Sequence, residues 1–316
     1  MLTMFELFKK RDFGALFNDT FGFFKLKWKN YFGNFFKVNF LILIAFMVIG
    51  YVLSQFYVKS MLGNINNPGM HNEYLVNYYM DNIGIIATAG FGMLILLLIL
   101  SVIQMAFPVF YLQLLEKNGD YKPQSSEISS LIKQNFGRML IFCLATFFVV
   151  GILYIIAYII IMILTVLLIG FLLWIIVVPY FSALVYLSLY HYINKKSGYF
   201  EALGFAFNTL HNNFWKIVGS NLILTIIIQM VAAIIAMVPF MIIFFIGFVS
   251  MSDSNSIENA QWFVYSLGAL VGVVMVLSVL LNNMVIVNFG LVYYGEMEKK
   301  ESISASSEID QIGLDE

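Results

Sequence analysis

The chain has 316 residues, of which 61% are hydrophobic and only 11% are charged, with a formal net charge of −1. Soluble domains carry about a quarter charged residues, so this composition excludes a protein whose whole surface faces water. Apolar runs of the length needed to span about 30 Å of hydrocarbon recur along the chain. The sequence therefore predicts an all-α polytopic membrane protein.

Six transmembrane helices fit the apolar runs. The first covers about residues 38–57 and the second about 83–115. The uncharged stretch between Arg138 and Lys195 has room for two spans, with a tight return near Thr165 to Gly170. The fifth covers about 217–248 and the sixth about 262–294. Residues 63–82 and 250–261 are polar, lack Lys and Arg, and are predicted to be outer loops.

The basic residues give this topology a direction. Excess Lys and Arg in short flanking segments marks the cytoplasmic side of a membrane protein. Six spans leave only Lys59 on the outer side, and we predict a multi-pass protein of the plasma (inner) membrane with both termini in the cytoplasm. The amino-terminal MLTMFELFKKRDF has no apolar stretch of signal-peptide length, so we expect it to stay on the mature protein. The predicted cytoplasmic residues are Lys9, Lys10, Arg11, Lys25, Lys27, Lys29, Lys37, Lys117, Lys122, Lys133, Arg138, Lys195, Lys196, Lys216, Lys299 and Lys300.

Amphipathic segments precede every second span. Apolar residues recur every three or four positions before the first, third and fifth spans, which is typical of one helical face. Such helices, with lysines on the other face, lie in the membrane interface. The fold prediction is thus three repeats, each an interfacial amphipathic helix followed by a helical hairpin. The apolar positions are Phe13, Leu16, Phe17, Phe21, Phe24, Trp28 and Phe32 in the first; Ile128, Leu131, Ile132 and Phe136 in the second; and Phe200, Leu203, Phe207, Leu210 and Phe214 in the third.

The repeat units are placed at about residues 13–117, 125–195 and 199–295, within one membrane domain of residues 1–295. Asn30, Asn135 and Asn213 mark the points where each helix would turn into the bilayer, because asparagine can cap exposed backbone groups. Trp28 and Trp215 are expected at headgroup depth. Residues 296–316 are predicted to be a polar, disordered cytoplasmic tail. The alternative is six unrelated spans with basic linkers.

Two segments resemble a known family. GYFEALGFAFNTLHNNFWKIVGSNLILTIIIQMVAAII (198–235) and FNDTFGFFKLKWKNYFGNFFKVNFLILI (17–44) resemble the integral-membrane domain found in some glycerophosphodiester phosphodiesterases and in stand-alone bacterial membrane proteins of unassigned function. The resemblance implies the same membrane fold for most of residues 13–295. We do not expect the hydrolase activity, because fewer than thirty residues follow the sixth predicted span, in place of the soluble barrel that carries the metal ligands of the phosphodiesterases.

Catalytic signals are sparse in this sequence. His71 falls in an outer loop, whereas His191 and His211 lie near the predicted cytoplasmic face, so the three cannot share a site. Cys143 lies inside an apolar run and is expected to pack there. No HExxH, GxSxG or glycine-rich phosphate loop occurs. We predict no catalytic, metal-binding or cofactor-binding residues and no cofactor.

Uncharged polar residues do occur within the predicted spans. They are explained either by hydrogen bonds between helices or by a polar groove between spans two, five and six. The candidate groove residues are Gln104, Gln229, Asn282 and Asn283, and the other polar span residues are Asn221, Thr225 and Asn288.

The predicted function is a non-enzymatic membrane protein that contacts lipid or organises a membrane complex. Its expected partners are the bilayer and anionic headgroups on the cytoplasmic face. The sequence predicts no nucleic-acid partner and identifies no protein partner. The alternative is a transporter or facilitator for a small or amphipathic solute. The candidate lipid-contact residues are Lys25, Lys27, Trp28, Lys29, Arg138, Trp215 and Lys216.

Overall fold

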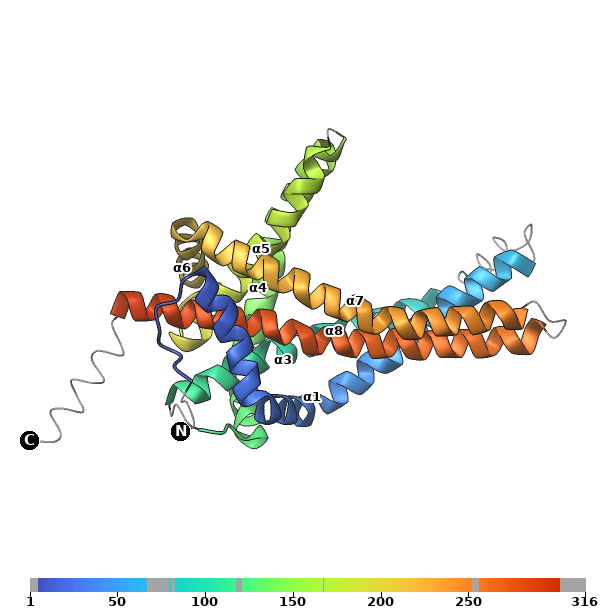
Figure 1. Ribbon diagram of the computed structural model, residues 1–316, viewed down its shortest axis with the longest axis horizontal. Coiled ribbons are helices and arrows are strands. Elements are labelled where there is room, and N and C mark those ends of the chain that lie inside the picture. The colour runs from blue at the N-terminus through green and yellow to red at the C-terminus, as the bar shows by residue number, and fades with distance from the viewer. Residues whose placement is uncertain are drawn as a thin grey trace, which may run out of the picture. The chain divides into compact units, whose positions relative to one another are not determined.

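The computed structural model describes residues 5–66, 80, 83–117, 121–166, 168–251 and 256–301, and within them the fold is helical throughout, with no strand. Figure 1 shows the helices along the chain. Their bounds are α1 Phe13–Asn66, α3 Ile83–Lys117, α4 Ser125–Thr165, α5 Ile169–Asn194, α6 Tyr199–Asn212, α7 Phe214–Met251 and α8 Ser256–Glu301.

Five helices are long and apolar enough to cross a membrane. In the described part of the chain the qualifying stretches are Leu97–Glu116, Ser125–Thr165, Ile169–Asn194, Phe214–Ile246 and Ser266–Glu301. They coincide with the second to sixth predicted spans. The first predicted span lies within α1, and its side chains from residue 49 onward lie outside the described part of the chain. Residues 67–79, 81–82 and 252–255 of the two predicted outer loops also lie outside it.

The predicted return between the third and fourth spans is confirmed. α4 ends at Thr165 and α5 begins at Ile169, and the backbone N–H of Leu168 donates to Thr165 O at 2.9 Å. Leu168 closes the turn in the left-handed region, with φ 64°. A Cβ on Gly170 would lie 2.5 Å from Ile161 O, so only glycine fits there without a shift of the backbone. Figure 1 shows α4 and α5 as a hairpin.

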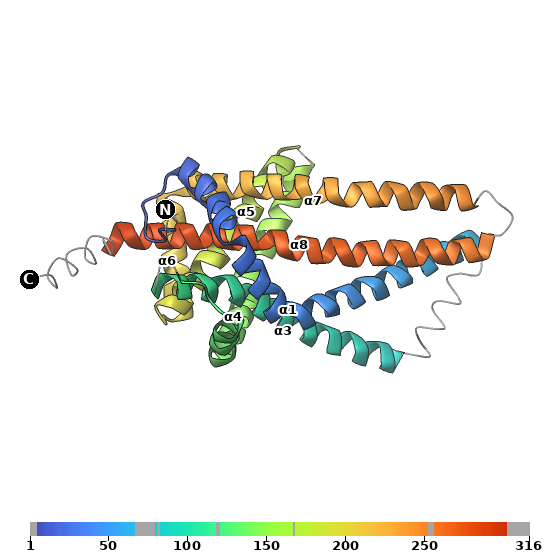
Figure 2. The ribbon, with the colours of Figure 1, turned by 60° about the horizontal axis from the view of Figure 1, so that its bottom comes forward.

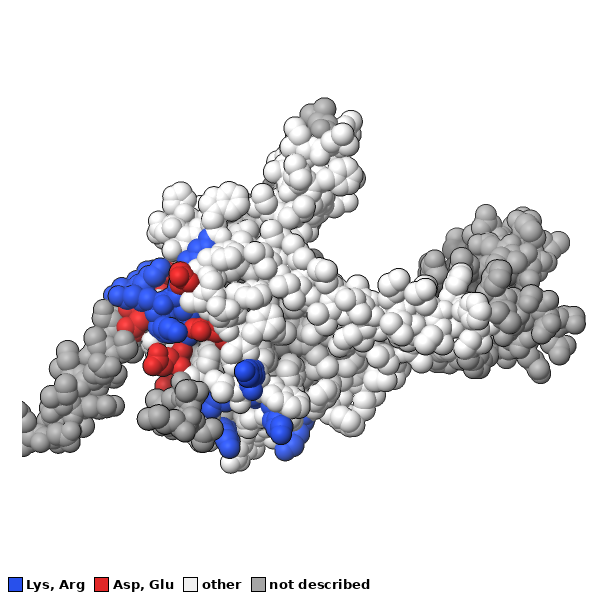
Figure 3. Space-filling view, in the orientation of Figure 1, with Lys and Arg blue, Asp and Glu red and all other residues white. Residues whose placement is uncertain are grey.

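The chain divides into two compact units. Unit 1 contains Met1–Val38, Val102–Ile227 and Asn282–Glu316, and unit 2 contains Asn39–Ser101 and Ile228–Leu281. Every charged side chain that the structure describes belongs to unit 1. Figure 3 shows these side chains gathered over part of the surface, whereas the α4–α5 hairpin presents none towards its turn. This segregation agrees with the uneven distribution of Lys and Arg in the sequence.

The core of unit 1 joins the first part of α1 to the last part of α8, which cross in both Figure 1 and Figure 2. The Tyr31 hydroxyl donates to Asn283 Oδ1 at 2.8 Å, and Asn288 Nδ2 donates to Thr20 Oγ1 at 2.9 Å. All four side chains are fully buried. Buried polar groups need such partners, so these hydrogen bonds fix where α1 crosses α8.

Two of the three predicted helix breaks are wrong. α1 passes through Asn30 and α4 passes through Asn135 without interruption, and Asn135 Nδ2 simply donates to Leu131 O, four residues earlier. The third break is correct, since α6 ends at Asn212 and α7 begins at Phe214. Asn213 leaves the helical region with φ −135° and ψ 35°. A separate short helix is therefore present only before α7.

The end of α8 also differs from the prediction. The tail was expected to begin at residue 296, yet the helix continues to Glu301. Glu296 is 6% exposed and accepts from Lys216 at 3.0 Å and Lys299 at 2.7 Å. The pair with Lys216 joins this end of α8 to α7, and the pair with Lys299 lies within α8. Residues 302–316 lie outside the described part of the chain.

Unit 2 contains the remaining parts of α1, α3, α7 and α8. Gly272 lies so close to α1 that a Cβ there would be 3.2 Å from Met47 O. Small residues permit this kind of close approach between membrane helices. A shallow apolar groove on α7 is lined by Phe240, Met241, Phe244 and Phe245. Apolar exposure of this kind is what a lipid-facing surface requires.

Candidate functional site

One face of the first part of α1 is fixed by an aromatic cluster. Tyr31 and Phe35 are fully buried and meet Phe107 of α3 edge-on, with ring centroids 5.2 and 5.1 Å apart. Tyr111 packs on Tyr31 at 4.7 Å. Edge-to-face aromatic pairs add about 0.5–1.5 kcal/mol each beyond the area they bury. The cluster therefore determines which side of α1 faces outward.

The outward face of α1 carries large apolar and basic side chains together. Trp28 is 53% exposed and Phe36 is 43% exposed, and between and beside them Lys25 and Lys29 are exposed. Lys29 Nζ lies 5.8 Å from the Trp28 ring centroid. The predicted apolar stripe of this helix is thus divided, since Leu16 and Phe24 are buried in the protein while Phe13, Phe21 and Trp28 are exposed. We call Phe21, Lys25, Trp28, Lys29 and Phe36 the aromatic–basic face.

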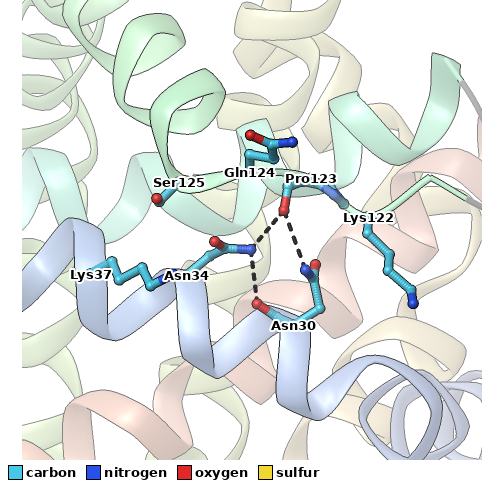
Figure 4. A pocket seen from close by; sticks show the side chains of 7 residues that line it. All are labelled: Asn30, Asn34, Lys37, Lys122, Pro123, Gln124 and Ser125. Carbon is cyan, nitrogen blue, oxygen red and sulfur yellow. Dashed lines mark hydrogen bonds between the residues drawn. The ribbon is translucent and has the colours of Figure 1, made fainter.

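A second segment is tied to α1 close to this face. Asn34 Nδ2 donates to Pro123 O at 2.7 Å and to Asn30 O at 2.9 Å. Asn30 Nδ2 donates to the same Pro123 carbonyl at 3.3 Å, and its Oδ1 accepts from the Tyr111 hydroxyl at 2.8 Å. Asn30 was predicted to break the helix; instead, it connects α1 to α3 and to the segment before α4. Figure 4 shows the bonds to Pro123.

These bonds form the floor of an open polar pocket of about 360 Å³. Figure 4 shows its lining, with Asn30, Asn34 and Lys37 on α1, Gln124 and Ser125 across from them, and Lys122 extending from the same segment as Gln124 towards the other side. Both lysines are exposed. Neither has an ion-pair partner among the described residues. The pocket is lined by Asn30, Asn34, Lys37, Lys122, Pro123, Gln124 and Ser125.

A local capping arrangement sets the far wall of the pocket. Glu127 Oε2 accepts from the backbone N–H of Gln124 at 2.9 Å, and Glu127 Oε1 accepts from the Tyr121 hydroxyl. The bond from the Gln124 N–H is the one that a Glu three positions into a helix makes to the backbone of the capping residue. The hydrogen bond to Glu127 raises the pKa of the Tyr121 hydroxyl. Both carboxylate oxygens therefore have donors within their own segment.

Other basic side chains are engaged inside the protein. Arg138 Nη2 donates to Tyr192 O at 2.8 Å and Ser197 O at 2.6 Å, and its guanidinium lies 4.1 Å from the Tyr192 ring centroid. Lys216 pairs with Glu296, and its side chain is 18% exposed. The structure thus places these two candidate lipid-contact residues in intramolecular contacts. Trp215, by contrast, is 72% exposed beside the α6–α7 break.

The amino-terminal segment is held by a buried arginine. Arg11 is 3% exposed, and its guanidinium donates to Asp19 Oδ2 at 2.8 Å and to Leu7 O at 2.7 Å. Burial lowers the pKa of Arg11 and the Asp19 carboxylate counteracts this, so the guanidinium stays charged. Lys9 Nζ lies 3.5 Å from the same carboxylate. Arg11 and Lys9 therefore share one carboxylate, which offsets part of the positive charge here.

The candidate groove residues differ in burial and in the contacts they make. Asn283 is fully buried in its bond with Tyr31, and Asn282 and Gln104 are half-buried in unit 1. Gln229 belongs to unit 2 and is exposed. Asn221 is 1% exposed and accepts from the Thr225 hydroxyl at 3.5 Å within its own helix. Asn283 thus has a partner on another helix, and Asn221 has one within its own helix.

The histidines and the cysteine do not converge. His191 is 9% exposed and stacks on Phe205 with centroids 4.1 Å apart, while His211 is exposed on α6. Cys143 is a half-buried free thiol of α4, and His71 lies outside the described part of the chain. Within the residues that the structure describes, no group of three or more His, Cys, Asp or Glu side chains is placed to hold a metal ion.

Comparisons with protein-family models, curated proteins and solved structures find no match to this chain. The resemblance to the phosphodiesterase-associated membrane domain therefore stays a prediction. The features of this chain that bear most directly on its function are the aromatic–basic face and the polar pocket.

The polar pocket was missed by the sequence analysis. Its residues come from positions 30–37 and 122–125, which sequence alone does not bring together. A partial signal was present: Gln124 followed three positions later by Glu127 marks a helix start, and Lys37 directly precedes the first predicted span. Those two signals predict that residues 30–37 and 122–125 lie at the same membrane surface, but they do not predict that the two segments are in contact.

Proposed function

We propose that the chain is a non-enzymatic, multi-pass protein of the plasma membrane, with both termini in the cytoplasm. In this proposal α1 contacts anionic lipid headgroups and so orders lipid, or a complex of proteins, around unit 1. The observation that supports it is the aromatic–basic face. Tryptophan and phenylalanine are favoured at the membrane interface, and lysines beside an anionic surface each contribute about 1 kcal/mol.

The charges on this face are available to lipid. Lys25, Lys27 and Lys29 have no acidic partner among the described residues, whereas Lys9 and Lys195 are paired with Asp19 and Glu301. Long lysine stems can lie along apolar surface while the ammonium group reaches the headgroups. The exposed lysines of α1 therefore add to the surface potential that anionic lipids experience.

The test compares two variants with the same loss of charge. The full chain is reconstituted in nanodiscs of phosphatidylcholine and phosphatidylglycerol, and spin-labelled lipids report its preference for phosphatidylglycerol. Lys25→Gln with Lys29→Gln should reduce that preference severalfold, because two unpaired lysines are lost at about 1 kcal/mol each at most. Lys9→Gln with Lys195→Gln is the control, since these lysines already have carboxylate partners.

The outcomes separate specific contact from net charge. A loss of preference confined to the α1 pair supports the proposal. Equal losses in both pairs would mean that only net charge matters, and no loss in either would refute headgroup contact by α1. Orientation is tested separately with Lys133→Cys in a Cys143→Ala background. An impermeant maleimide should label this exposed position only from the cytoplasmic side.

No described contact favours the transporter hypothesis over helix packing. Asn283 and Asn288 each bond to α1 and are fully buried. Accessibility of cysteines placed at Gln104 and Gln229 would test the pathway directly. Labelling of both positions from opposite sides of the membrane would favour a facilitator.

A further inference from the structure

We infer that the polar pocket between α1 and the segment before α4 binds the phosphate group of an anionic headgroup. The inference rests on the proposed function and specifies the chemical group that this pocket of unit 1 recognises. It requires a positive cavity of suitable size, hydrogen-bonding groups inside it, and a position that a headgroup reaches. The described residues supply each of these.

The pocket carries positive charge because two lysines from different segments line it. Lys37 extends from α1 and Lys122 from the segment before α4 (Figure 4). Lysine serves as a compact point charge for phosphate. Among the described residues, the carboxylate nearest to Lys122 in sequence is Glu127, which already accepts from Tyr121 and from the backbone of Gln124. Neither lysine is neutralised by an acid in the described part of the chain.

The floor of the pocket holds an acceptor without a donor. Asn34 is 7% exposed, and its Nδ2 donates to the carbonyls of Pro123 and Asn30. Its Oδ1 accepts no hydrogen bond from the described residues. Figure 4 shows this amide oxygen on the side of Ser125. An acceptor that lines the pocket together with the Ser125 hydroxyl suits a ligand that carries hydroxyl groups as well as phosphate, as glycerol phosphate does.

Size and position also fit a headgroup. A volume of about 360 Å³ falls at the lower end of small-molecule sites, which is ample for glycerol phosphate. Lys37 directly precedes the first predicted span, which places the pocket at the depth of headgroups. The same chemistry could come from a soluble phosphate compound, so the experiment must distinguish the two sources.

The test measures binding to the full chain purified in neutral detergent. The probes are dihexanoyl phosphatidylglycerol, glycerol 3-phosphate and inorganic phosphate, with dihexanoyl phosphatidylcholine as the zwitterionic control. Each lysine is expected to contribute about fivefold, from about 1 kcal/mol at 1.4 kcal/mol per tenfold. Lys37→Gln with Lys122→Gln should therefore weaken phosphatidylglycerol binding about 30-fold and leave the thermal unfolding midpoint unchanged.

A second variant keeps both lysines and changes the wall. Gln124→Glu adds a carboxylate to the pocket and should weaken phosphatidylglycerol binding severalfold. Gln134→Glu is the matched control, because Gln134 is exposed on the same helix outside the pocket and should bind as the unaltered chain does. Full binding by Gln124→Glu and by the double lysine variant would overturn the inference.

The remaining outcomes distinguish the pocket from the proposed function. Loss of binding in Lys25→Gln with Lys29→Gln, but not in the pocket variants, would refute the pocket and leave the aromatic–basic face intact. Binding of glycerol 3-phosphate or phosphate as tight as that of the lipid, and lost in the pocket variants, would support the pocket and assign it a soluble ligand. Equal binding of phosphatidylcholine in all variants would refute recognition of an anion.

Discussion

Gly290 is the position where a single added methyl group should damage unit 1 most directly. It lies on α8 where α3 and α5 approach. A Cβ there would be 2.3 Å from Leu112 Cδ1, 2.7 Å from Tyr190 Oη and 2.8 Å from Tyr190 Cζ. The end of the Leu112 side chain could move. The Tyr190 ring is fully buried and its hydroxyl donates to Ile286 O at 3.1 Å, so it cannot move without losing a hydrogen bond.

The expected cost of Gly290→Ala follows from two opposing effects. Overpacking a filled core costs about 1–3 kcal/mol, while replacing glycine by alanine within a helix gains about 0.5–1 kcal/mol. The variant should therefore lose about 1–2 kcal/mol of unfolding free energy. Unfolding in mixed micelles with increasing dodecyl sulfate, followed by circular dichroism, measures the difference.

Two other glycines provide the control. A Cβ on Gly137 of α4 or on Gly204 of α6 would meet nothing within 4 Å. Gly137→Ala and Gly204→Ala should therefore stabilise the protein by about 0.5–1 kcal/mol. If Gly290→Ala were as stabilising as these controls, α8 would not pack against Leu112 and Tyr190 as described, and the reasoning would be refuted.

Three further changes test other contacts by the same unfolding measurement. Thr20→Val should lower the unfolding free energy by about 1–3 kcal/mol, because Asn288 Nδ2 loses its 2.9 Å partner in a buried site. The double variant Thr20→Val with Asn288→Leu should recover most of that free energy. No recovery would contradict the hydrogen-bond explanation. Glu296→Gln should lower the unfolding free energy by about 1–3 kcal/mol, because Lys216 and Lys299 lose their shared carboxylate. Glu301→Gln removes an exposed ion pair and should change the unfolding free energy by less than about 1 kcal/mol. Leu168→Gly should stabilise the α4–α5 turn by about 0.5–1 kcal/mol, because the φ of 64° strains any residue with a Cβ; a loss of stability would show that the Leu168 side chain matters more than its backbone.

The helices were predictable because span length is a local property. An uncharged run between Arg138 and Lys195 is too long for one membrane helix, so a return was required near its middle. In the structure α4 ends at Thr165 and α5 begins at Ile169. A glycine is needed at position 170 because a Cβ there would lie 2.5 Å from Ile161 O. Hydrophobic length thus determined the number of helices here without any knowledge of tertiary contacts.

The helix breaks were not predictable because asparagine has several equivalent uses. Asn30, Asn135 and Asn213 each precede an aromatic residue in a similar context. Asn30 instead bonds to Pro123 and Tyr111, far along the chain, and Asn135 bonds back to its own helix. Asn213 reaches Thr209 O and, at 3.4 Å, Glu296 Oε2 on α8. The partner decides the outcome, and two of these three side chains have partners outside their own segment.

The same reasoning applies to the lysines that the proposed function uses. In the sequence, sixteen basic residues are equivalent markers of the cytoplasmic side. In the structure Lys9, Lys195 and Lys216 are each paired with a carboxylate, so each contributes little net field at a distance. The lysines of α1 and Lys122 have no such partner among the described residues. The first part of α1 and the segment before α4, where the aromatic–basic face and the polar pocket lie, therefore present lysines that no described carboxylate pairs with.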